Sequence, residues 1–181
     1  MSAGEQRQAQ TLTRIQRLTL ADFRSYASLS VEIDSACVAL IGDNGAGKTN
    51  LLEALSLFAP GRGLRRAELA EMPRHDGAGG FAVSVELAED GPDAPFGSDT
   101  KLGVGLSVPA VDGKRTRMTR INGADAGSAS AFAEHMRLVW LTPDMDGLFR
   151  GSAGDRRRFL DRLVLAVDAG HAPRTDRKSV V

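Results

Sequence analysis

The chain has 181 residues, of which 42% are apolar and 25% charged, a composition typical of a folded domain with its own core. Its 23 Lys and Arg residues balance its 23 Asp and Glu residues, so no overall charge excess indicates binding to nucleic acid or to an anionic membrane. A polyanion site must therefore be a local cluster. Cys37 is the single cysteine, which excludes an intramolecular disulfide, and we interpret it as buried core filler.

No stretch approaches the roughly 18 apolar residues of a membrane span, and the polar start lacks the apolar segment of a signal peptide. We therefore expect a cytoplasmic protein without a membrane partner. The predicted organisation is a disordered extension at 1–12, a folded part at 13–171 and an unstructured stub at 172–181.

The first third of the chain predicts two strands, a central strand, a loop and a helix. Alternation of apolar and polar residues predicts half-buried strands at 14–20 and 29–33. The continuous apolar run at 37–41 predicts a strand that is buried on both faces in the middle of a sheet. A helix is expected over 48–59. Its predicted apolar stripe comprises Leu51, Leu52, Leu55 and Phe58.

Turn-rich stretches at 73–80 and 89–99 separate three further predicted strands, which indicate antiparallel hairpins. These strands cover 81–87, 102–108 and 115–121. Another apolar strand is expected at 137–141, and helical spacing predicts a helix at 154–167.

The loop between the apolar run and the first predicted helix has the pattern G-x-x-x-x-G-K-T. Its glycines allow N–H groups to turn inward around an anion, and the helix N-terminus adds its positive dipole end. The Lys48 ammonium can reach the β- and γ-phosphates, and the Thr49 hydroxyl can coordinate Mg²⁺. Because no N-K-x-D stretch is present to recognise guanine, ATP with Mg²⁺ is expected. The predicted nucleotide-binding residues are Gly42, Asp43, Asn44, Gly45, Ala46, Gly47, Lys48 and Thr49.

Hydrolysis requires a carboxylate at a strand end and a residue that positions the attacking water. Asp168 ends a run that continues a helical stripe, and Pro143 separates Asp144 from the apolar strand predicted before it. Every glutamine lies before residue 17. We therefore assign no catalytic residue and expect ATP binding without hydrolysis.

Two basic clusters stand out. The candidate DNA contacts are Lys114, Arg115, Arg117 and Arg120. Strand alternation places Arg115 and Arg117 on one face, and the alternative to DNA binding is a charged edge that blocks strand addition. The run Arg156, Arg157 and Arg158 opens a predicted helix, where the helix dipole disfavours cations. This position indicates an acidic partner surface or a phosphate, and the alternative is a solvated face.

In order and spacing, six stretches resemble the N-terminal half of the RecF family of DNA replication and repair proteins, over roughly 12–171. They are "LTLADFRSY", "GDNGAGKTNLLEAL", "GRGLR", "INGADAGS", "WLTPDMDGLF" and "GDRRRFLDRLVLAVD". The phosphate loop alone is shared with the wider group of chromosome-maintenance and double-strand-break-repair ATPase heads. The run at 156–161 is more particular to RecF.

The resemblance implies an α/β P-loop NTPase fold, namely an ABC-ATPase-like lobe I with a mixed central sheet and an antiparallel β subdomain. It implies binding of ATP and Mg²⁺, an ATP-dependent homodimer, and binding to single-stranded or gapped duplex DNA. It also implies recombination mediator proteins as partners, in recombinational repair at gaps and the SOS response. By position, the resemblance places Arg24 near the nucleotide.

In the family, the signature loop, the Walker B carboxylates and the second lobe lie in a C-terminal half that this sequence does not contain. We therefore expect a truncated chain, an N-terminal fragment that is not by itself the family's weak DNA-dependent ATPase. Two alternatives remain open. One is a small P-loop kinase of a metabolite, with "GDRRRF" as an arginine lid, and the other is a truncated chain with no stable fold.

Overall fold

The computed structural model describes residues 12–90, 100–147 and 151–167. The predicted stub at 172–181 and all but the last residue of the predicted extension at 1–12 lie outside these ranges. That last residue, Leu12, already belongs to the first strand.

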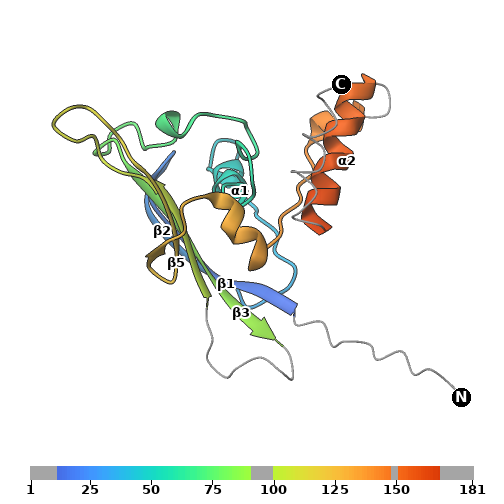
Figure 1. The fold of residues 1–181 in the computed structure, drawn as a ribbon, viewed down its shortest axis with the longest axis horizontal. Helices are drawn as coiled ribbons and strands as arrows, with labels where there is room; N and C mark the ends of the chain where they lie inside the picture. The colour runs from blue at the N-terminus through green and yellow to red at the C-terminus, as the bar shows by residue number, and fades with distance from the viewer. Residues whose placement is uncertain (1–11, 91–99, 148–150, 168–181) are drawn as a thin grey trace, which may run out of the picture.

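One antiparallel sheet dominates the described residues, with the strand order β2-β1-β3-β4-β5-β6 (Figure 1). Its strands are β1 (Leu12–Phe23), β2 (Tyr26–Glu32), β3 (Phe81–Asp90), β4 (Thr100–Leu106), β5 (Arg117–Ile121) and β6 (Ala124–Asp125). Every adjacent pair of these strands is antiparallel. The two predicted N-terminal strands and the three predicted hairpin strands are thus confirmed, with boundaries shifted by a few residues.

Two α-helices accompany the sheet, α1 (Lys48–Ser56) and α2 (Ala153–Val167), and both confirm predicted helices. Short 3-10 helices are η1 (Leu69–Glu71), η2 (Ala129–Glu134) and η3 (Pro143–Gly147). Figure 1 shows α1 against one side of the sheet and α2 set apart from it. At the start of α2, the Asp155 amide donates to Ser152 Oγ at 3.2 Å, which caps the helix.

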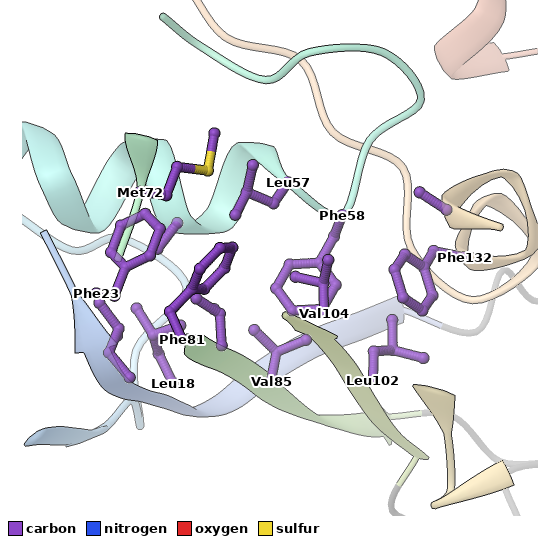
Figure 2. Packing of buried hydrophobic residues seen from close by; sticks show 14 of the residues in the cluster. Leu18, Phe23, Leu57, Phe58, Met72, Phe81, Val85, Leu102, Val104 and Phe132 are labelled. Atoms are coloured by element: carbon purple, nitrogen blue, oxygen red, sulfur yellow. The ribbon is translucent and has the colours of Figure 1, made fainter. Parts of the chain in front are cut away.

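The core lies between one face of the sheet and α1 (Figure 2). Alternate residues of β3, among them Val83 and Val85, point into it, as period-2 alternation requires. Phe23 at the end of β1 meets Phe81 edge to face, with ring centroids 5.3 Å apart. The buried residues of this core cluster are Leu18, Leu20, Phe23, Leu51, Ala54, Leu57, Phe58, Met72, Phe81, Val83, Val85, Leu87, Leu102, Val104, Leu106, Ala129 and Phe132.

The predicted central strand at 37–41 is wrong for this chain. These residues form no strand, and Ile41 is 93% exposed. A strand buried on both faces requires neighbouring strands and covering layers, and no described strand pairs with this segment. Cys37, interpreted as core filler, is exposed for the same reason.

The predicted strand at 137–141 is also wrong. The segment has no regular structure, and Leu141 is 75% exposed. Like the run at 37–41, it is apolar in sequence but has no pairing partner among the described residues. The described strands pair only antiparallel, as expected for the antiparallel β subdomain, and no parallel pair of the expected mixed central sheet occurs among them.

The apolar stripe of α1 differs from the predicted one. Leu51 and Phe58 are buried as expected, whereas Leu52 is 51% exposed. Glu53 takes a buried place on the helix, with an exposed fraction of 1%. No helix of the described residues is long and apolar enough to cross a membrane.

Leu51 and Leu52 provide a matched test of this packing. We expect Leu51→Ala to lower the free energy of unfolding by about 2–5 kcal/mol, because it leaves a cavity between α1 and the sheet. Leu52→Ala changes the same side chain on the same helix and should cost less than about 1 kcal/mol. Urea unfolding followed by circular dichroism measures both, and equal costs would contradict the assignment of the buried face.

Candidate nucleotide-binding site

The loop before α1 adopts the backbone conformation that its glycines permit. Gly42, Gly45 and Gly47 have φ angles of 150°, 87° and 95°, in a region that residues with a Cβ rarely enter. The Ala46 amide donates to the Asp43 carbonyl at 3.2 Å, which closes a tight turn within the loop. The predicted phosphate-binding residues thus form one compact loop.

Lys48 lies across this loop. Its Nζ donates to the carbonyl oxygens of Gly42 and Asp43, each at 2.7 Å. The ammonium is therefore held beside the loop backbone, where it can meet an incoming anion. Thr49 follows on the first turn of α1 and is exposed.

The N-terminus of α1 carries donors suited to an anion. The helix begins at Lys48, and its first backbone bonds run from the Asn50 and Leu51 amides to the Gly47 carbonyl, so the Lys48 and Thr49 amides have no carbonyl partner within the helix. Gly47 supplies no side-chain cap, and the first turn contains no acidic residue. The open amides and the helix dipole therefore favour phosphate at this end.

These residues fit a nucleoside triphosphate with Mg²⁺. The loop offers backbone donors and the Lys48 ammonium to phosphate oxygens, and Thr49 offers a hydroxyl to the metal. Among the described residues, no group of three or more His, Cys, Asp or Glu side chains could hold a metal ion.

The turn between β1 and β2 packs directly on the loop. A Cβ built on Gly47 would lie 2.6 Å from Tyr26 Oη and 3.0 Å from Ser25 Oγ. The Tyr26 hydroxyl also donates to the Ala46 carbonyl at 3.4 Å. Sequence segments about 20 residues apart therefore form one wall of the site.

Arg24, which the family resemblance places near the nucleotide, belongs to this turn. Its guanidinium points to α1, where its Nη2 donates to Glu53 Oε1 at 2.6 Å. Arg65 reaches the same carboxylate, with Nη1 2.7 Å from Oε2. The sequence analysis assigned no role to Glu53 or Arg65, because their spacing of 12 residues shows no periodic signal.

The candidate DNA contacts are spread over β5 and the turn before it. Arg117 lies opposite Leu106 of β4 and Arg120 opposite Gly103, so they occupy opposite faces. Arg115 Nη1 donates to the Ala70 carbonyl at 3.4 Å. Lys114 Nζ pairs with Asp112 Oδ2 at 3.3 Å. The structure therefore does not gather the four cations on one surface.

The remaining sequence candidates lie around α2. Arg156 Nη1 donates to the Gly151 carbonyl at 2.7 Å, and Arg157 is exposed. Asp144 belongs to η3 and does not directly follow a described strand, and Asp168 lies outside the described residues. The helix predicted in the run before Asp168 is confirmed as far as Val167.

The sequence is similar to an ATPase domain model and to RecF proteins. The family model described as "AAA ATPase domain" matches residues 14–74. The "DNA replication and repair protein RecF" of Mesorhizobium japonicum is 55% identical over 162 residues, covering 90% of this chain and 41% of the relative. That of Rhizobium etli (strain CIAT 652) is 48% identical over 160 residues, covering 88% of this chain and 41% of the relative.

Two solved structures share the fold. They are the recombination mediator protein RecF of the RecFOR pathway, one with ATPrS and one with ATP. Both have a TM-score of 0.70, at 24% and 22% identity. They cover 90% and 88% of this chain, and 41% of each solved chain. The chain thus spans about two fifths of the length of these proteins.

Gly47 and Gly45 provide a matched test of the loop geometry. Both have positive φ, but a Cβ at Gly45 meets nothing within 4 Å, whereas one at Gly47 overlaps Tyr26. We expect Gly45→Ala to cost about 1–2 kcal/mol from backbone strain alone. Gly47→Ala should cost about 1–3 kcal/mol more, because the Tyr26 ring and the Ser25 hydroxyl must move. Thermal unfolding measures both, and equal losses would contradict the packing of the turn on the loop.

Proposed function

We propose that this chain, which belongs to the RecF family of DNA replication and repair proteins and spans about two fifths of its relatives' length, binds ATP through residues 42–49. The observation that carries the proposal is the loop itself. Its three glycines have positive φ, Lys48 Nζ lies 2.7 Å from two loop carbonyls, and an uncapped helix begins at the loop's end. The ATP named with the solved RecF structure supports the same ligand.

Each part of the loop has a separate task in this proposal. The amides of the loop and of the first turn of α1 bind phosphate oxygens, and Lys48 neutralises the β- and γ-phosphates. Thr49 contributes its hydroxyl to Mg²⁺, which supplies charge compensation when it is bound with the nucleotide. The residues in contact with the nucleotide are Gly42, Asp43, Asn44, Gly45, Ala46, Gly47, Lys48 and Thr49.

We expect these 181 residues alone to bind ATP without turning it over. Hydrolysis needs a carboxylate that can polarise or position water. Glu53, the buried carboxylate of α1, accepts hydrogen bonds from two arginines through both of its oxygens and is committed to that role.

The wider role we propose is that of a recombination mediator. It would act at single-stranded or gapped duplex DNA in recombinational repair and the SOS response. ATP would drive homodimer formation, and other mediator proteins would be partners. The cytoplasm, where bacterial DNA lies, is the expected location. The names of the relatives and the RecFOR pathway of the solved structures support this role.

A small P-loop kinase is not favoured. Two strands, β1 and β2, precede the phosphate loop, whereas such kinases usually carry the loop on the first strand. The relatives are named as replication and repair proteins. The kinase alternative uses residues 154–159 as an arginine lid. These residues lie in the first turns of α2, which stands apart from the sheet (Figure 1).

Lys48 provides the direct test of ATP binding. We expect Lys48→Ala to raise the Kd for MgATP at least about tenfold, because the ammonium no longer neutralises the phosphates. The control is Lys101→Ala, which removes a lysine that pairs with Glu86 at 3.0 Å on the sheet. Isothermal titration calorimetry measures both, and an unchanged affinity in Lys48→Ala would refute the proposed site.

The basic residues provide the test of DNA binding. We expect Arg117→Ala to weaken binding to gapped DNA and to reduce the slope of log affinity against log salt by about 1, the loss of one phosphate contact. Arg17→Ala is the control, because Arg17 pairs with Glu32 at 2.9 Å and Glu86 at 3.2 Å. Fluorescence anisotropy over a salt series measures both. The same slope in Arg117→Ala and the unchanged protein would favour the charged-edge alternative.

A further inference from the structure

Hydrogen bonds behind the phosphate loop join its helix to two other segments of the chain. Glu53 of α1 has an exposed fraction of 1%. Its carboxylate accepts from Arg24 in a fork, with Nε at 3.0 Å and Nη2 at 2.6 Å. The oxygen that accepts from Arg24 Nε also accepts from Arg65 Nη1 at 2.7 Å. One buried carboxylate thus holds two guanidinium groups.

Asn50, one turn earlier on α1, closes the arrangement into a ring. Its Oδ1 accepts from Arg65 Nη1 at 2.8 Å, and its Nδ2 donates to Ser25 Oγ at 2.9 Å. Ser25 follows Arg24 in the chain, so the path returns to its start. We call this set the clamp ring; its members are Arg24, Ser25, Asn50, Glu53 and Arg65.

The clamp ring fixes a strained turn. Arg24 has a φ of 52°, which is unusual for a residue with a side chain. The surroundings bind it three ways. Its amide donates to the Met72 carbonyl at 2.8 Å, its Nη1 donates to the Glu71 carbonyl at 2.7 Å, and the rest of its guanidinium binds Glu53. A buried, doubly paired carboxylate is costly to disrupt, so the turn has one strongly preferred position.

The turn so fixed forms the wall of the phosphate loop. Ser25 and Tyr26 lie so close to Gly47 that even a Cβ would collide with them. Gly47 is the last residue before α1, and its carbonyl accepts from the Asn50 amide at 2.8 Å. The clamp ring therefore constrains the point where the loop becomes a helix, which is the end that offers amides to phosphate.

We propose that the clamp ring positions the phosphate loop for ATP, its members acting through the loop and not as phosphate ligands. The inference rests on the proposed function, since it takes ATP as the ligand of the loop. With the ring closed, the loop is ordered before the nucleotide arrives. With the ring open, the loop becomes ordered only when ATP binds, and this entropic cost lowers its affinity for ATP.

The test uses the two exposed members, Ser25 and Arg65, because their replacement leaves the buried carboxylate paired with Arg24. We expect Ser25→Ala and Arg65→Gln each to raise the Kd for MgATP about tenfold. Arg74→Gln is the matched control. It removes an arginine that pairs with Asp22 at 2.9 Å near the same end of β1, outside the ring. Its Kd should stay within about twofold of the unchanged protein.

The double variant tests the ring as a unit. If the ring acts as one closed path, one break removes most of its effect, and Ser25→Ala with Arg65→Gln should bind MgATP about as weakly as either single variant. Independent contacts would instead multiply to about a hundredfold loss. A hundredfold loss in the double variant, or unchanged affinity in the single variants, would overturn the inference.

A readout without nucleotide separates positioning from general destabilisation. Amide hydrogen exchange of residues 47–49 should quicken in Ser25→Ala and Arg65→Gln but not in Arg74→Gln, under conditions where all three are folded. Equal exchange in all three would also overturn the inference.

The failures of the two proposals can be distinguished. If the unchanged protein binds MgATP, Lys48→Ala does not, and the ring variants bind normally, then the ring inference alone fails. If the unchanged protein does not bind MgATP, both proposals fail.

Discussion

The packing of α1 on one face of the antiparallel sheet is the contact on which the rest of the structure depends. Leu51, Ala54 and Phe58 bury their side chains against strands whose inward residues alternate with outward ones. This contact sets where α1 starts, and the start of α1 sets where the phosphate loop ends. The loop is exposed, and the helix behind it and the turn beside it support its geometry.

Beside this apolar contact stands a polar one of a different kind. Glu53 is as deeply buried as the leucines but carries a charge, which the fold tolerates because Arg24 and Arg65 both bind it. Apolar packing fixes how far α1 lies from the sheet, whereas these directional bonds fix which residues of the β1–β2 turn face the loop. The two together explain how an exposed glycine loop can be ordered before its ligand arrives.

Local patterns in the sequence were sufficient for much of this fold. Alternation and turn signals predicted five of the six described strands of the sheet, all but the two-residue β6, and the phosphate-loop pattern with its following helix predicted α1 and the candidate site. The failures have one physical origin, which is that a pattern reports a residue's preference and not its partner. The run at 37–41 is as apolar as a central strand, yet no described strand lies beside it, and Ile41 is exposed. Leu52 is exposed and Glu53 is buried, the reverse of what the apolar pattern predicts. The arginines that pair with Glu53 lie 29 and 12 residues away in the sequence, so no local pattern shows that they make its burial possible.

The central claim is that residues 42–49 bind ATP in a loop already held by its surroundings. Nuclear magnetic resonance of the labelled chain, titrated with MgATP, tests this most directly. The account predicts that the largest backbone amide shifts occur within 42–49 and at the adjoining Ser25 and Tyr26, and that inorganic phosphate shifts a subset of the same amides. Shifts concentrated elsewhere, such as on the outer face of β4 and β5 around Gly103 and Met118, would contradict it.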